Sequence, residues 1–154
     1  PSVAYYYRPG DGPDTTAVTL RANLVHLFTP TWGVLLGGEM GAGFSSKVQG
    51  HGGARVNAYH VFNGDDEEAS TKYALRFGPA ASAGVPFENH VDEWNLVGEV
   101  GFQILPGNFV VDIALFGGGN RAAVYRKIDG EERRRPSDVA PVAGLALGGG
   151  WQGF

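Results

Sequence analysis

The chain has 154 residues with no cysteine, and its 12 Lys and Arg against 16 Asp and Glu give a formal net charge of −4. This balance gives nucleic-acid binding no support, because there is no positive excess to neutralise phosphates, and the lack of cysteine excludes disulfides and thiolate metal sites. The 25 glycines do not repeat as in collagen, the hydrophobic content of 43 % is too high for a disordered chain, and no apolar run reaches the roughly 18 residues of a membrane-spanning helix.

Eight segments alternate between apolar residues and small or polar residues with a period of two, which indicates β-strands. The first segment is short and ambiguous. In chain order the segments span residues 2–8, 15–28, 33–45, 53–62, 72 onward, 93–104, 109–117 and 139–154. No domain boundary is visible, so we predict a single all-β domain over residues 1–154.

Tight turns and longer links alternate between these segments. Residues 29–32 and 105–108 predict tight turns, and Asn63-Gly64 opens a third. The other four links, at 9–14, 46–52, 86–92 and 120–138, are longer or more polar. Tight turns at one end and loops at the other are typical of an antiparallel up-and-down barrel. In the last link, Asp129-Gly130 is a hairpin signal, so we expect a strand pair that projects beyond the sheet.

The alternation alone does not say which face is buried, because a soluble barrel turns its apolar face inward and a membrane barrel turns it outward. The composition of the other, non-apolar face decides between the two, since that face is mostly Gly and Ala with isolated charges of both signs. Those charges are Arg21, Glu39, Arg55, Lys72, Arg76, Glu99 and Asp112. Small residues and a few opposed charges fit a narrow closed lumen, where charges must pair. We interpret these charges as a salt-bridge plug, with an ion pathway as the alternative, and expect the remaining charges, Glu93 among them, in loops.

Aromatic residues on the apolar face fall at the ends of the segments, whereas the middles carry Leu, Val, Ala, Ile and Met. They are Phe28, Phe44, Phe62, Trp94, Phe102, Phe109 and Trp151, with Trp32 in a tight turn. Such a distribution predicts an aromatic girdle around an apolar band. The segments are long enough to cross a bilayer at a tilt, which takes ~9–11 residues.

In this pattern the chain resembles the small eight-stranded outer-membrane barrels of the OmpA transmembrane domain and OmpX type, over nearly its whole length. The resemblance implies short periplasmic turns, longer outer loops, a sealed polar lumen with salt bridges, and a C-terminal aromatic residue that the barrel-assembly machinery reads, here Phe154. One departure is that Gln152 and Gly150 share the parity of Phe154, while Trp151 lies on the other face. Either a glycine-rich bulge shifts the register there, or Phe154 carries no signal.

Several other residues are candidate sites. His26 and His60 lie on the apolar face near the tight turns, where we expect interfacial residues, and His51 and His90 are expected in exposed loops. Ser82, His90 and Asp92 suggest the rim pair of a lipid A-modifying enzyme, but no spacing constrains them. The acidic run at 65–68 lacks the spaced ligands of a calcium loop and predicts a solvated turn. We predict no catalysis, no metal and no cofactor.

A basic run in the last link is the best candidate contact surface. It consists of Arg126, Lys127, Arg133, Arg134 and Arg135. In an extracellular loop these residues would bind lipopolysaccharide phosphates; alternatively they pair with Asp129, Glu131 and Glu132 in the same hairpin.

The sequence therefore predicts a bacterial outer-membrane barrel that acts as a structural or interaction protein and presents extracellular loops. Its expected partners are membrane lipid, lipopolysaccharide, the barrel-assembly machinery and another envelope or extracellular protein. Two alternatives stay open. One is a lipid A-modifying enzyme on the same barrel, and the other is a soluble lipocalin- or avidin-like barrel with Leu20, Leu36, Leu96 and Ile113 around an apolar cavity.

Overall fold

The computed structural model describes residues 1–8, 14–45, 48–85, 93–128, 131–136 and 138–152, with the side chains of residues 123–136 excepted. Nearly all of these residues lie in β-strands. The strands are β1 (Ser2–Tyr7), β2 (Thr15–Leu27), β3 (Trp32–Phe44), β4 (Val48–Val61), β5 (Thr71–Val85), β6 (Glu93–Pro106), β7 (Phe109–Ile128), β8 (Glu131–Pro136) and β9 (Ala140–Trp151). No helix among the described residues is long and apolar enough to cross a membrane.

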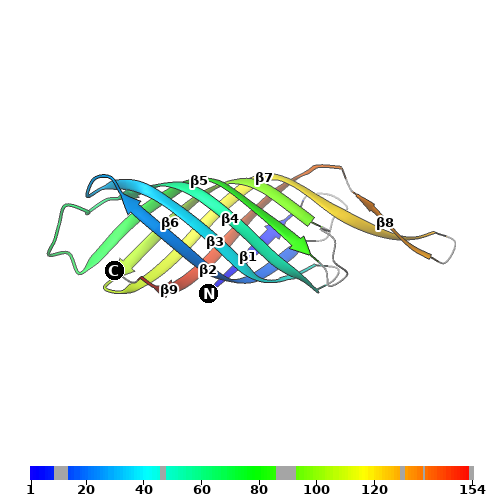
Figure 1. Cartoon of the computed structure of the whole chain (residues 1–154), viewed down its shortest axis with the longest axis horizontal. Coiled ribbons are helices and arrows are strands. Elements are labelled where there is room, and N and C mark those ends of the chain that lie inside the picture. Colours follow the sequence, from blue (N-terminus) through cyan, green and yellow to red (C-terminus); the bar gives the residue numbers. More distant parts are fainter. Residues whose placement is uncertain (9–13, 46–47, 86–92, 129–130, 137, 153–154) are drawn as a thin grey trace.

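Eight of these strands close into one antiparallel up-and-down barrel. Each strand from β1 to β7 pairs with the next, β9 pairs with β7, and β1 pairs with β9 to close the ring. The strands run at a slant to the long axis of the barrel (Figure 1). The predicted fold class is confirmed, and the eighth strand of the barrel is β9, because β8 pairs only with β7.

The hairpin of β7 and β8 projects beyond the barrel, as predicted. The outer part of β7, from Ala123 to Ile128, pairs with β8 from Pro136 to Glu131. In Figure 1 this strand pair extends past the end of the barrel opposite the turn of residues 62–70. The chain therefore carries a two-stranded extension at the end where the longer links were predicted.

Two predicted links are largely strand. β4 begins at Val48, so most of the predicted link at 46–52 belongs to the barrel wall, and β7 continues to Ile128 instead of ending at 117. Gly50, Gly52 and Gly53 lie at the start of β4, and Gly117, Gly118 and Gly119 lie where the prediction ended β7. Glycine has no side chain and hides the period-two pattern that marks a strand. Their backbones pair regularly all the same, with Gly52 opposite Met40 and Gly118 opposite Val97.

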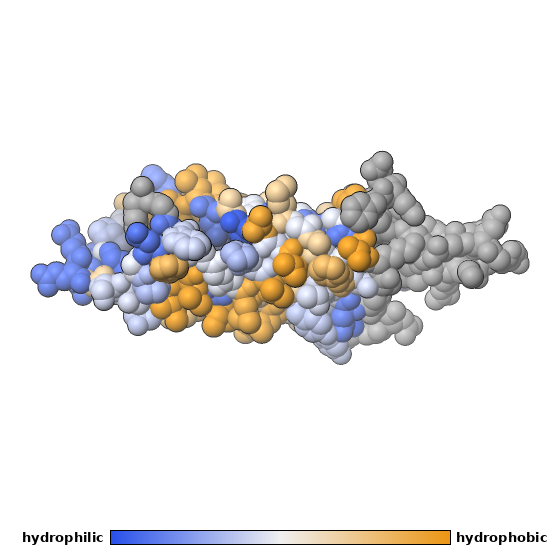
Figure 2. All heavy atoms as spheres, turned by 90° about the horizontal axis from the view of Figure 1, so that it is seen from below, coloured by the Kyte–Doolittle hydropathy of each residue, from blue (hydrophilic) through white to orange (hydrophobic). Residues whose placement is uncertain are grey.

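The apolar face of the wall points outward. Leu36 is 46 % exposed, Val100 54 % and Ile113 45 %, whereas Arg76 and Glu99 on the other face are buried. Figure 2 shows apolar residues gathered around the middle of the barrel and hydrophilic residues at the end that carries the turn of residues 62–70. This is the surface of a membrane barrel.

The soluble ligand-binding alternative is therefore wrong. The residues that it would place around an internal cavity all face outward and are exposed, namely Leu20, Leu36, Leu96 and Ile113. The physical reason is the width of the interior: charged side chains already occupy it, and an eight-stranded barrel has little further room.

The outward face gives a first prediction. Replacing mid-strand Val100 by arginine would put a charge against acyl chains and should lower the free energy of unfolding by about 2–4 kcal/mol in lipid vesicles. Urea titration followed by tryptophan fluorescence measures this change. As a control, Glu67→Arg introduces the same side chain in an exposed turn and should change stability by no more than about 0.5 kcal/mol. Equal effects of the two substitutions would contradict the sidedness.

Candidate functional site: the barrel interior

The interior is layered along the barrel axis. At the end with the tight turns lies an apolar cluster of Leu35, Tyr59, Val61, Ala74 and Leu105. Charged residues follow, and beyond them comes a second apolar cluster that includes Tyr6, Val97, Phe116 and Val142. A second polar group, around Arg8 and Glu93, lies toward the other end. The interior is therefore an alternation of apolar and ionic side chains.

The central charges form a closed ring of alternating sign, which we call the charge ring. Its members in order of contact are Arg21, Glu39, Arg55, Glu99, Arg76 and Asp112, contributed by β2, β3, β4, β6, β5 and β7. All of their side chains are at most 11 % exposed. Three guanidinium groups and three carboxylates balance in charge, and each group contacts two partners of opposite sign.

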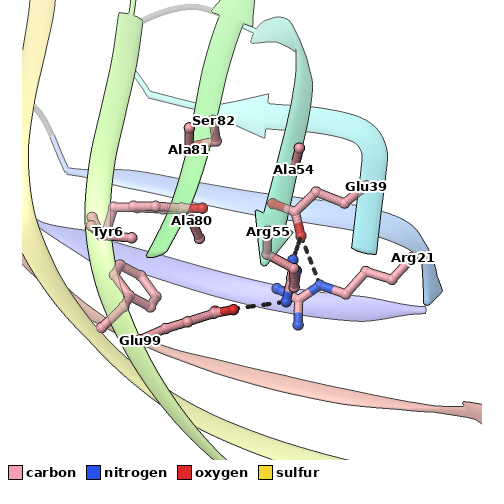
Figure 3. A pocket seen from close by; sticks show the side chains of 11 residues that line it. Tyr6, Arg21, Glu39, Ala54, Arg55, Ala80, Ala81, Ser82 and Glu99 are labelled. Atoms are coloured by element: carbon pink, nitrogen blue, oxygen red, sulfur yellow. Dashed lines mark hydrogen bonds and ion pairs between the residues drawn. The ribbon is translucent and has the colours of Figure 1, made fainter. Parts of the chain in front are cut away.

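The distances around the charge ring are those of charge-assisted hydrogen bonds and longer ion pairs. Arg21 Nε lies 2.7 Å from Glu39 Oε2, and Arg55 Nη2 also bonds that oxygen. Arg76 Nη1 lies 2.6 Å from Glu99 Oε1 and its Nη2 2.8 Å from Asp112 Oδ2. The contacts of Arg55 with Glu99 and of Arg21 with Asp112, at 3.7 and 3.5 Å, close the ring. Figure 3 shows Arg21 and Arg55 converging on Glu39, with Glu99 reaching Arg55 from the side.

Two further polar side chains extend the charge ring. The Arg76 guanidinium donates to Asn57 Oδ1 at 3.2 Å, and His51 Nε2 lies 3.4 Å from Glu39 Oε1. Burying a lone charge costs several kcal/mol, so a buried charge is tolerated where its partners are close and its hydrogen bonds are made. The ring meets both conditions for most of its polar atoms.

Inward-facing glycines provide the room for these large side chains. Gly37 lies opposite Arg55, Gly101 opposite Arg76 and Gly144 opposite Phe116 in the strand register. A Cβ atom at Gly101 would lie 2.7 Å from Nε of Arg76, and one at Gly144 would lie 2.2 Å from Cζ of Phe116. Real Cβ atoms do not approach other atoms so closely, so these bulky inward residues need glycine on the neighbouring strand.

Very little open space is left beside the charge ring. A cavity of about 20 Å³ lies between Arg21, Glu39 and Arg55 on one side and Tyr6 on the other (Figure 3), and Phe116 also lines it. This volume is enough for about one water molecule. Tyr6 and Phe116 are in ring contact, with centroids 4.7 Å apart, and they border the cavity.

Lys72 is the one predicted lumen charge that the structure leaves outside the charge ring. Its Nζ lies 3.5 Å from the carbonyl oxygen of Gly64, near the tight-turn end. The parity of Lys72 does match that of Arg76, but it sits four residues nearer the rim. The period-two pattern therefore predicts on which face of the wall Lys72 lies, but not its position along the barrel axis.

A second buried ion pair, between Arg8 and Glu93, was missed by the sequence analysis. The two side chains are 2 % and 4 % exposed. Glu93 was expected in a solvated loop, and this is wrong because it is the first residue of β6 and faces inward. Its carboxylate accepts further hydrogen bonds from Thr15 at 3.2 Å and from Gln49 at 2.9 Å. Glu93, Asn95 and Glu99 share one parity, which was the available signal.

The expectation for His51 is also wrong. It lies in β4 and is 4 % exposed, instead of standing in an exposed loop. Its ring packs against Tyr6, with centroids 5.8 Å apart, and Nε2 faces Glu39. His51 has the same parity as Gln49 and Arg55, but Gly50, Gly52 and Gly53 around it concealed the strand.

Asp14 links β1 and β2 at the end of the barrel near Arg8. The Tyr5 hydroxyl donates to its Oδ2 at 2.5 Å, and the backbone N–H of Arg8 donates to its Oδ1 at 3.1 Å. The hydrogen bond from Tyr5, followed by that from Arg8, holds the pKa of the Asp14 carboxyl below its ordinary value. The carboxylate therefore stays ionised at neutral pH.

The predicted girdle residues all stand on the outer face and are exposed. They are Phe28, Trp32, Phe44, Phe62, Trp94, Phe102, Phe109 and Trp151. Trp32 begins β3 instead of lying in the turn, and its ring packs on His60, with centroids 4.3 Å apart. His60 in turn contacts Phe62, and His26 contacts Phe28. Both histidines thus belong to the aromatic contacts near the tight-turn end.

The remaining candidates are only partly described. Ser82 Oγ accepts a hydrogen bond from Asn95 Nδ2 at 3.1 Å, while His90 and Asp92 lie outside the described residues. Phe154 also lies outside them. For the basic run, the register pairs Arg126 with Arg133, but none of its side chains is described. No group of His, Asp and Glu among the described residues could hold a metal ion.

Comparison with known proteins gives a similar solved structure. No protein-family model matches the chain, and no curated protein matches it. Among solved structures, the chain is similar to Ail, the attachment invasion locus protein of Yersinia pestis, with 18 % identity, a TM-score of 0.44, and coverage of 97 % of this chain and 91 % of that one.

The glycine opposite Arg76 gives a second prediction. Gly101→Val would force the guanidinium of Arg76 away from Asp112 and should lower the free energy of unfolding by about 1–3 kcal/mol. The matched control is Gly98→Ala on the same strand, because a Cβ there points outward and meets nothing within 4 Å. Urea unfolding of both variants in the same vesicles measures the difference. A Gly101→Val protein as stable as the control would show that the interior has room to spare.

Proposed function

We propose that the protein is a bacterial outer-membrane β-barrel with a plugged polar lumen, and that it serves as a membrane-embedded structural or interaction protein presenting extracellular loops. The observation that carries this proposal is the charge ring, which spans the interior of a wall whose outer face is apolar. The outer face supports insertion in a bilayer. The charge ring supports an interior whose paired charges hold the strands of the wall together and do not form a pathway for ions.

The argument for a plug rests on the contacts of the charge ring. Each of its six groups is held by two partners on different strands, so opening a passage would separate several buried ion pairs at once. The apolar cluster around Leu35 and Tyr59 and the one around Tyr6 and Phe116 lie on either side. A hydrated ion would have to cross all three layers, and the cavity beside the ring has room for about one water molecule.

An interaction role is favoured over catalysis by the placement of the polar groups. Ser82 is engaged by Asn95, and the ionic groups of the interior are engaged with one another. The projecting hairpin of β7 and β8, by contrast, lies outside the barrel and carries the basic run (Figure 1). We therefore assign the contact role to this hairpin and propose the phosphate groups of lipopolysaccharide as its ligand, through bidentate arginine contacts.

Reconstitution tests the barrel and the plug together. The protein should stay dispersed only with detergent or lipid, should migrate faster on gels before heating than after, and should add no stable conductance steps to a planar bilayer. A monodisperse protein in detergent-free buffer would overturn the membrane assignment. Stable conductance steps from a heat-modifiable protein would overturn the plug alone.

The ligand of the hairpin is tested by binding to lipopolysaccharide micelles. Replacing Arg133, Arg134 and Arg135 by serine should weaken binding about a hundredfold or more, because three lost charge-assisted contacts together remove over about 3 kcal/mol. The control replaces Asp65 and Asp66 in the turn at the other end by serine and should bind as the unmodified protein does. Unchanged affinity in the triple variant would contradict lipopolysaccharide as the ligand.

A further inference from the structure

One contact of the charge ring is weaker than the rest, namely that between Arg55 and Glu99. Nη1 of Arg55 lies 3.7 Å from Oε2 of Glu99, which is too long for a hydrogen bond. The other five contacts of the ring are 3.5 Å or shorter. A polar contact longer than about 3.5 Å is one that a water molecule can bridge.

A buried donor without a partner belongs to the same contact. Nε of Arg55 is buried and has no hydrogen-bond partner among the described residues, although the rest of the guanidinium contacts Glu39 and Glu99. The side chains of Arg55 and Glu99 are only 4 % and 5 % exposed, so bulk water does not reach them. A buried N–H without an acceptor destabilises the folded state, and such groups nearly always bond the protein or an ordered water.

The cavity beside the charge ring provides the room for a ligand at this contact. Arg55 and Glu99 both line it, and Figure 3 shows the carboxylate of Glu99 directed at the guanidinium of Arg55. Its volume of about 20 Å³ fits a single molecule of the size of water. Tyr6 and Ser82, which carry hydroxyl groups, line it as well. The site is therefore both roomy and polar, as a buried water requires.

The charges around the cavity select a neutral ligand. Arg21 and Arg55 bring two positive charges to its lining, and two carboxylates, those of Glu39 and Glu99, balance them. An anion would face both carboxylates and a cation both guanidinium groups, so either ion would disturb the pairing that keeps the buried charges stable. The ligand must also accept a hydrogen bond from Arg55 and donate one to Glu99, because a guanidinium only donates and a carboxylate only accepts. At this size, water meets all of these conditions.

We propose that one buried water molecule occupies this cavity, where it accepts a hydrogen bond from Nε of Arg55 and donates one to the carboxylate of Glu99. The inference rests on the plug proposed above and extends it. The water completes the charge ring at its longest contact and connects β4 with β6, which are not neighbours in the sheet. It is thus a structural part of the plug and not the first step of an ion pathway.

Two substitutions of nearly equal shape at Ala80 test the site. Ala80 lines the cavity and stands directly opposite Arg55 in the register of β4 and β5. Ala80→Val fills the cavity with methyl groups and displaces the water without replacing its hydrogen bonds. Ala80→Thr fills it equally, but its hydroxyl can accept from Arg55 in place of the water. Urea unfolding in lipid vesicles should give an unfolding equilibrium constant about tenfold larger for Ala80→Val than for Ala80→Thr, the effect of one unpaired buried donor.

The matched control makes the same two substitutions at Ala22, which is exposed on the outer face of β2. There the valine variant should be at least as stable as the threonine variant, because acyl chains offer the hydroxyl no partner. An Ala80→Val protein as stable as Ala80→Thr, or more stable, would show a cavity without bound water and overturn the proposal.

Two further measurements identify the ligand. A crystal structure of the unsubstituted protein should show one ordered solvent atom within hydrogen-bond distance of Nε of Arg55, and Ala80→Val should lack it; no such atom in the unsubstituted protein would reject the site. The stability difference between the two Ala80 variants should be the same in sodium chloride and in potassium gluconate, and a dependence on the salt would show a bound ion instead of water. Stable conductance steps would reject the plug alone, since the order of stability of the variants still decides whether water is bound.

Discussion

The interior of an eight-stranded barrel is only as wide as the side chains that fill it, and this limit governs the rest of the structure. Arg21, Arg55 and Arg76 cross that space and meet three carboxylates, and the sum of their charges is zero. Because the outer face is apolar, the wall can hold these charges only if they satisfy one another. Fold, glycine content and sidedness all follow from this requirement.

Glycines on neighbouring strands make room for the long charged side chains of the interior. Gly37 and Gly101 lie opposite Arg55 and Arg76, so the strand next to each long side chain gives way to it. Glycine is unfavourable in most strands, but it weakens a strand by only a modest amount. In this barrel it leaves free the volume that a neighbouring long side chain occupies. Other glycines, Gly50, Gly52 and Gly53, explain why the start of β4 was hard to see in the sequence.

The two ends of the molecule offer different surfaces. One carries the tight turns and the aromatic and histidine contacts around Trp32 and His60, which suit a membrane interface. The other carries the projecting hairpin of β7 and β8, which the barrel holds clear of its wall. A barrel whose interior charges pair with one another and whose wall carries one long extension is suited to presenting a surface, and this division of the molecule underlies the proposed function.

The sequence by itself determined the fold class, the face that turns outward and six of the residues that form the charge ring, because alternation with a period of two assigns each residue to a face. It did not determine where along the barrel axis each side chain lies or which partners it meets. Lys72 belongs to the same alternating set as the ring residues and lies outside the charge ring. Glu93 and His51 lie inside the barrel against expectation. Only the tertiary structure decided these, since strand register sets which side chains meet across the lumen, and a residue without a side chain leaves no periodic signal.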